Sequence, residues 1–249
     1  MYTDVTHVEV GYCLVEPEGG FAFEPPRTVF STRERPLGPR AIQNCPAVNA
    51  IERHLVEIPC PVTLRLMLEE EDGEPALGVI DQGTLVEPHR IAEMVALEPP
   101  SRWRDPARPV LRLRLPFFFV TDAPCMVNIM PPFLAGGPRR WPGTMAAARF
   151  PLTIWPQTLD WAFEWDRRED ELALHAGEPL AYALFEFNKP DARPTLLEAA
   201  LTPELAEYRK GMADIHHITP RIEEVWEEAA RRRPARLLVP LAEAEAGGG

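Results

Sequence analysis

The clearest pattern along the chain is a strict alternation of apolar and polar residues over 159–165. Every second residue is large and apolar and those between are small or acidic, with Leu159, Trp161, Phe163 and Trp165 set against Asp160, Ala162 and Glu164. Successive side chains of a strand point to opposite faces of a sheet, so this pattern predicts a strand with one buried face. With the charged turn at 166–170 and a return strand at 171–175, it predicts a hairpin at the centre of the core.

The same alternation predicts further strands at 7–15, 62–69 and 110–120. Residues 71–75, Glu-Asp-Gly-Glu-Pro, have the composition of a turn, and a short return strand is expected directly after it. Pro116 interrupts the third strand. Because proline lacks a backbone N–H, it indicates a sheet edge, a bulge or a strand that passes from one sheet to another.

Two helices are expected near the C-terminal end, and each begins with a Thr-Pro pair, at Thr202 and at Thr219. A threonine can cap the N-terminus of a helix, and a proline is tolerated in its first turn. The expected organisation is a single β-rich domain over residues 1–241, with the C-terminal helices over about 202–233 and a disordered tail at 242–249.

Composition supports an architecture of short extended elements. Proline accounts for 29 of the 249 residues, well above its typical share of about 5%. Proline is poorly tolerated inside helices and central strands, so long regular elements are disfavoured. The hydrophobic fraction of 45% is sufficient for a core. The predicted fold class is mostly β: a jelly-roll-like β-sandwich with two C-terminal helices packed on it.

The net charge, the length of the apolar runs and the cysteine pattern limit which partners and which cellular compartment are expected. The formal net charge is −12, which disfavours nucleic acid because binding to phosphates is driven by cationic contacts. We expect no membrane association, since the longest apolar run, Leu115 to Val120, is far too short to span a bilayer and no signal peptide is recognisable. The four cysteines form no C-x-x-C pair. We therefore predict free thiols and a cytoplasmic protein, or a virion-associated one if it is phage-encoded.

No strong catalytic motif is present. The chain contains only two serines, Ser31 and Ser101, and neither lies in the context of a nucleophile. His175 and Glu178 flank a Gly-Glu-Pro corner and are the nearest approach to a ligand pair; they fit a strand-end histidine and a turn carboxylate as well as a ligand-binding site. We therefore predict no cofactor, and the alternative is a divalent metal such as iron or zinc held by His175, Glu178 and His216.

Four tryptophans fall close together in the middle of the chain, at 141, 155, 161 and 165. The alternating pattern favours core packing for Trp161 and Trp165. Trp141 and Trp155 lie beside prolines on expected loops, where an aromatic ring can contact a ligand or a partner. The candidate ligand- or partner-binding residues are therefore Trp141, Trp155, His175 and Glu178, and the catalytic residues are unknown.

Several short motifs resemble a family of uncharacterised bacterial and phage-associated proteins. They are Trp141-Pro142-Gly143, Arg149-Phe150-Pro151, Trp155-Pro156, the segment 161–165, Gly177-Glu178-Pro179, Asn44-Cys45-Pro46 and Pro59-Cys60-Pro61. The resemblance covers about residues 40–210 and implies no activity, so it assigns no catalytic residue. The arrangement of strand, Gly-Glu-Pro corner and strand is also similar to jelly-roll and cupin-like domains, a likeness of fold alone.

These observations favour a non-catalytic binding or assembly protein, such as a bacterial or phage-encoded accessory or structural subunit. Its partner would be a protein, either a different chain or a second copy of this one. The alternative is a cupin-like metal-dependent enzyme acting on a small molecule. The absence of a catalytic motif and the many extended segments bounded by proline favour the first hypothesis over the second.

Overall fold

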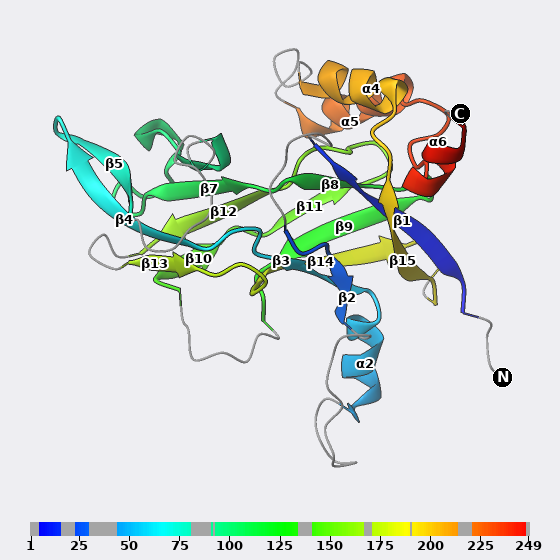
Figure 1. The fold of residues 1–249 in the computed structure, drawn as a ribbon, viewed down its shortest axis with the longest axis horizontal. Coiled ribbons are helices and arrows are strands. Elements are labelled where there is room, and N and C mark those ends of the chain that lie inside the picture. The colour runs from blue at the N-terminus through cyan, green and yellow to red at the C-terminus, as the bar shows by residue number, and fades with distance from the viewer. Residues whose placement is uncertain are drawn as a thin grey trace.

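The computed structural model describes residues 5–15, 23–29, 44–80, 91, 93–133, 141–166, 171–189, 191–213 and 221–247. Over these residues the chain is mostly β, and the helices α4, α5 and α6 come from its C-terminal part (Figure 1). This confirms the prediction of a mostly β fold with C-terminal helices. The jelly-roll strand order stays a prediction.

The described strands form four sheets. The largest has the order β11-β9-β14-β3-β2, with bounds Ala148–Pro151, Cys125–Met130, Pro179–Phe187, Leu55–Pro59 and Arg27–Thr28. The second has the order β10-β12-β7-β6, with bounds Gly143–Met145, Asp160–Trp165, Val110–Arg114 and Val95–Leu97. The two three-stranded sheets are β15-β1-β8, with bounds Arg193–Ala199, His7–Leu14 and Phe117–Val120, and β13-β4-β5, with bounds Leu172–Leu174, Leu64–Glu71 and Glu74–Val79.

Strand β12 has the predicted buried face. Trp161, Phe163 and Trp165 are each at most 1% exposed. The predicted hairpin is wrong, however, because β12 pairs with β7 and β10, whereas β13 pairs with β4 in a different sheet. The period of two determines which side chains are buried, but it does not determine which strand lies alongside.

The main hydrophobic core lies between the sheets. It combines Val127 of β9 and Phe185 of β14 with Leu113 of β7 and the buried aromatic residues of β12. Rings meet edge to face across the strands, as between Phe119 and Phe185, whose centroids are 5.3 Å apart. The β-sandwich is thus held together by the inner faces of opposing sheets.

The sheet β15-β1-β8 packs against two hydrophobic cores, one on each of its faces. On β8, Phe117 and Phe119 face the main core, while Phe118 and Val120 face a second core beneath the helices. Helices α4 (Pro203–Ala213) and α5 (Ile222–Arg232) cover that second face (Figure 1). Pro116 therefore marks a change of sheet, since β7 ends at Arg114 and β8 pairs with β1.

Helix α4 begins with the predicted cap. The backbone N–H of Leu205 donates a hydrogen bond to Oγ1 of Thr202 at 3.2 Å. Helix α5 buries Val225 and Ala229 against the second core, and the Thr-Pro pair predicted to begin it lies outside the described residues.

The structure differs from the predicted tail at 242–249, because residues Leu241–Gly247 form helix α6. Arg236 donates two hydrogen bonds to the carboxylate of Glu243, at 2.7 and 2.8 Å. The segment is rich in alanine and glutamate, which have high helix propensity. Two short helices, α2 (Pro46–Glu52) and the 3-10 turn η2 (Pro100–Arg102), complete the described elements.

Candidate functional site

Strands β4 and β5 form a hairpin that projects from one end of the molecule (Figure 1). At its tip Glu71 pairs with Glu74, and Asp72 and Gly73 between them have φ angles of 52° and 84°. Positive φ at both central residues is the type I′ geometry, for which Asp-Gly is a favoured sequence. The turn predicted from composition at 71–75 is confirmed.

The tip of this hairpin is strongly acidic. Its exposed acidic residues are Glu69, Glu70, Glu71, Asp72 and Glu74. No lysine, arginine or histidine occurs between Leu66 and Ile80, and none of the five carboxylates forms an ion pair with another described residue. Their charges repel one another, so a cation from outside this part of the chain would be attracted to the tip. We call the hairpin 64–79 with these carboxylates the acidic arm.

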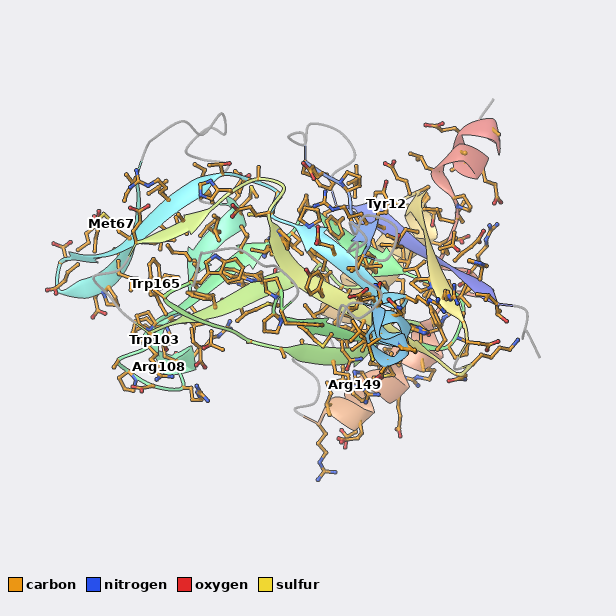
Figure 2. All side chains as sticks on the ribbon, turned by 90° about the horizontal axis from the view of Figure 1, so that it is seen from below. Tyr12, Met67, Trp103, Arg108, Arg149 and Trp165 are labelled. Atoms are coloured by element: carbon orange, nitrogen blue, oxygen red, sulfur yellow. The ribbon has the colours of Figure 1, made fainter. Side chains whose placement is uncertain are left out.

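Exposed apolar side chains and the edge strand β5 accompany the acids. Met67 and Val79 are 39% and 41% exposed, among the few large apolar side chains on the described surface. Figure 2 shows Met67 at the same end of the molecule as Trp103 and Arg108. Strand β5 lies at the edge of its sheet and pairs only with β4 among the described strands. The acidic arm therefore combines charge and apolar contact with an edge strand that has one partner, β4, among the described strands.

The corner that carries His175 and Glu178 is a β-turn. The N–H of Glu178 donates to the carbonyl of His175 at 3.1 Å, and Gly177 has a φ of 80°. Backbone hydrogen bonds tie this turn to Cys60, with Gly177 N–H donating to the Cys60 carbonyl at 2.9 Å and Cys60 N–H donating to the Glu178 carbonyl at 2.7 Å. Glu178 is exposed, and the imidazole of half-buried His175 has no partner for its buried Nε2 among the described residues.

A polar network around Arg27 holds the same corner from the other side. Arg27 donates to Glu57 at 2.7 Å, to Glu24 at 2.8 Å and to the Gly177 carbonyl at 3.4 Å. Tyr182 lies 3.5 Å from Glu57, and burial together with the nearby Glu57 charge raises the pKa of its hydroxyl. These contacts give the corner a structural role in joining β14 to β3 and β2.

The metal-site alternative is tested only in part. His216 lies outside the described residues, so the set of His175, Glu178 and His216 stays a prediction. Within the described part of the chain, no three histidine, cysteine, aspartate or glutamate side chains come together as a group able to hold a metal ion.

The two predicted loop tryptophans both lie near Trp161. Trp141 packs edge-on against Trp161 at a centroid distance of 5.2 Å and against Phe163 at 6.2 Å. Trp155 and Trp161 both line a cavity of about 120 Å³, to which the segment 155–161 contributes one wall. Trp155 thus lines a cavity and packs against the second core, whereas Trp141 packs against the main core. The predicted site residues therefore occupy several separate places in the fold.

Buried thiols are poor candidates for catalysis. Burial raises the pKa of Cys13, Cys60 and Cys125 to about 12, so each is protonated near neutral pH and is not nucleophilic. The four cysteines are free, as predicted, and Cys45 is the half-buried one.

Comparisons with known protein families, curated proteins and solved structures found no match to this chain. Any statement about the function of this protein therefore rests on its own residues. No helix among the described residues is long and apolar enough to cross a bilayer.

The sequence analysis predicted only a turn at residues 71–75. It did not identify the acidic arm as a candidate binding surface. The available signal was the run of acids within a stretch, Leu66 to Ile80, that has no basic residue. The cavity was also missed, because Trp161 was assigned to the core and the pattern of β12 does not reveal incomplete packing beside it.

Proposed function

We propose that this chain is a non-catalytic binding or assembly protein whose acidic arm docks on a partner protein with a basic surface. The observation that carries the proposal is the projecting hairpin with five exposed acids at its tip, none of which forms an ion pair with another described residue. A bacterial or phage-encoded accessory subunit, as the sequence motifs suggest, fits such a role.

Charge complementarity selects the partner. A second copy of this chain would bring another acidic arm and another net charge of −12, and like charges placed together oppose association. Nucleic acid is disfavoured for the same reason. A protein with clustered lysine or arginine is attracted to the tip, and long-range attraction raises the rate of encounter.

The strand edge supplies a mode of attachment. An extended segment can add to an exposed sheet edge through main-chain hydrogen bonds, while pockets and charges beside the edge give specificity. On the acidic arm this segment would lie along β5, with basic side chains near Glu70 and Glu71 and apolar side chains near Val79. An alternating basic and apolar strand has the matching pattern.

The test uses a labelled heptapeptide of alternating lysine and valine as the probe, with fluorescence anisotropy of the full chain as the readout. We expect binding that weakens with added salt. The double variant Glu70→Gln, Glu71→Gln should lower the affinity several-fold. The matched control Glu204→Gln, Glu207→Gln changes the net charge equally at exposed positions of α4 and should leave the affinity nearly unchanged.

Two further measurements make the test specific. Amide signals of β5 should shift on binding, and a peptide with the same lysines separated by glycine and serine should bind more weakly because it has low strand propensity. If both double variants lose the same affinity for the peptide, the effect comes from net charge alone. If the β5 amide signals do not shift, the peptide binds at another place on the protein. Either result contradicts the proposal, as does a stable homo-oligomer that buries the acidic arm.

A further inference from the structure

The tip of the acidic arm carries the only Asp-Gly pair in the chain, Asp72-Gly73. Both residues are exposed. Apart from the chain neighbours, no atom lies within 4 Å of the position that a Cβ on Gly73 would occupy. Glycine has no side chain to shield its backbone nitrogen, so this nitrogen is open to reaction with the carboxyl group of the residue before it.

The chemistry of an Asp-Gly pair needs only water. The backbone nitrogen of Gly73 attacks Cγ of the protonated Asp72 side chain. A new N–Cγ bond forms, and the amide proton leaves with the carboxyl OH as water, which gives a five-membered succinimide ring. Water then opens the ring. Opening at the main-chain carbonyl of residue 72 breaks the original peptide bond and leaves isoaspartate, whereas opening at Cγ restores aspartate.

The folded turn opposes this reaction. The ring closes only when Cβ of Asp72 and the nitrogen of Gly73 lie on the same side of the Cα–C bond. The φ angles of 52° and 84° indicate a type I′ turn, whose first central residue has a ψ of about +30°. This angle places the two atoms nearly opposite each other. The turn therefore has to open before the side chain can react.

The tip is a part of the molecule that can open by itself. The turn is held by the end of the ladder, where Glu71 pairs with Glu74. The five exposed carboxylates around it repel one another. Segments with few buried contacts open at a much lower free-energy cost than the whole fold. The turn should therefore open often, while β4 remains paired with β13.

We propose that Asp72-Gly73 is a site of spontaneous modification, at which the folded protein converts to isoaspartate through openings of the turn. Isoaspartate adds one carbon atom to the main chain. A two-residue turn sets the register of its hairpin, so the lengthened chain cannot keep Glu71 opposite Glu74. The conversion thus alters the tip of the acidic arm covalently. This inference concerns the turn alone and holds whatever partner the acidic arm binds.

The experiment ages the full chain at 37 °C near neutral pH, both in buffer and in guanidinium chloride. An isoaspartate methyltransferase measures the total isoaspartate. An endoproteinase that cleaves before aspartate, but not before isoaspartate, locates it by mass spectrometry. We expect isoaspartate at residue 72 in both samples, with a rate several-fold lower in the folded chain. The native amide signals of Glu71 and Glu74 should disappear as isoaspartate accumulates.

Two other aspartates of the same chain are internal controls. Asp105 is exposed but precedes Pro106, which has no N–H. Asp122 accepts hydrogen bonds from the backbone N–H groups of Leu237 and Leu238 at 2.8 and 3.3 Å, and these bonds hold its carboxylate in place. Neither aspartate should convert in the folded protein.

Three variants test the chemistry and the role of the turn. Asp72→Asn keeps a residue suited to this turn and releases ammonia, a better leaving group, so residue 72 should convert faster and with a change of mass. Leu77→Ala shortens the side chain opposite Leu68 in the hairpin and should raise the conversion rate of Asp72 several-fold. Val225→Ala is the matched control, because Val225 is buried in the helical layer; it should leave that rate unchanged.

Several results would overturn the proposal. They are the absence of isoaspartate at residue 72 in the folded chain when the chain in guanidinium chloride has converted, equal rates in the two samples, and equal conversion at Asp105 or Asp122. A Leu77→Ala variant that converts no faster than Val225→Ala would also contradict the role of the turn. If Leu77→Ala fails to fold, the comparison of the unmodified chain in buffer and in guanidinium chloride still decides the question.

Discussion

The guanidinium carbon of Arg209 lies 3.7 Å from the centroid of the Phe118 ring. Arg209 belongs to α4 and Phe118 to β8, so this cation–π contact joins the helical layer to the sheet beneath it. The same guanidinium donates to the Pro156 carbonyl at 2.9 Å and to Thr158 at 2.7 Å. One side chain thereby connects the helix, the sheet and the segment that forms a wall of the cavity.

We expect Arg209→Met to lower the free energy of unfolding by about 2–4 kcal/mol, because it removes the cation–π contact and leaves two acceptors without their donor. Urea denaturation measures this change. Arg104→Met is the control: Arg104 forms an exposed ion pair with Glu164, and such pairs are worth at most about 1 kcal/mol. If the two variants lose a similar free energy of unfolding, Arg209 contributes no more to stability than an arginine in an exposed ion pair.

Two glycines should respond to alanine with opposite signs. A Cβ at Gly11 would lie 2.6 Å from Cβ of Ala199 and 2.9 Å from a methyl carbon of Val120, so Gly11→Ala should destabilise the protein by about 1–3 kcal/mol through overpacking. At Gly211, within α4, the nearest atom would be 3.9 Å away. Gly211→Ala should stabilise by up to about 1 kcal/mol because alanine favours helix. Melting temperatures give both signs, and a tolerated Gly11→Ala would contradict the close approach of β1 and β15.

The buried thiols predict a fall of stability at alkaline pH. Burial raises the pKa of Cys13, Cys60 and Cys125 from about 9 to about 12. Above pH 9 the unfolded chain loses these protons while the folded chain keeps them, so the free energy of unfolding decreases as pH rises through the interval from 9 to 12. At pH 10 each thiol should contribute a loss on the order of 1 kcal/mol. Urea unfolding at pH 7, 9 and 10 measures it, and a flat profile to pH 10 would refute the burial of the thiols.

Thiol labelling gives a separate check of the same residues. Cys13 and Cys60 are at most 2% exposed and Cys125 is 6% exposed, whereas Cys45 is half-buried. In the native protein at pH 8 we expect one thiol to react rapidly with a disulfide reagent, and the other three to react only as the chain unfolds. Cys45→Ser should remove the fast phase. If a fast thiol persists in that variant, one of the other cysteines is accessible.

The sequence predicted local structure better than long-range pairing. Alternation revealed the buried face of β12, and the Asp-Gly pair with its acidic neighbours revealed the turn between β4 and β5. It did not reveal that β12 and β13 belong to different sheets, because partner choice depends on packing between distant segments. For the sites, the cavity that Trp155 and Trp161 line depends on packing between segments that are distant in the sequence, and no local pattern encodes that.

The parallel pairing of β1 with β15, which joins His7 to Arg193 and Cys13 to Ala199, bears on how the chain is made. During synthesis β1 can pair with β15 only after residues 193–199 have left the ribosome. Contacts so distant in sequence form slowly. Until then β1 exposes one free edge and the apolar face that α4 and α5 later cover. A nascent chain halted before residue 193 would therefore be a substrate for chaperones or aggregation, whereas a chain that includes β15 closes that edge.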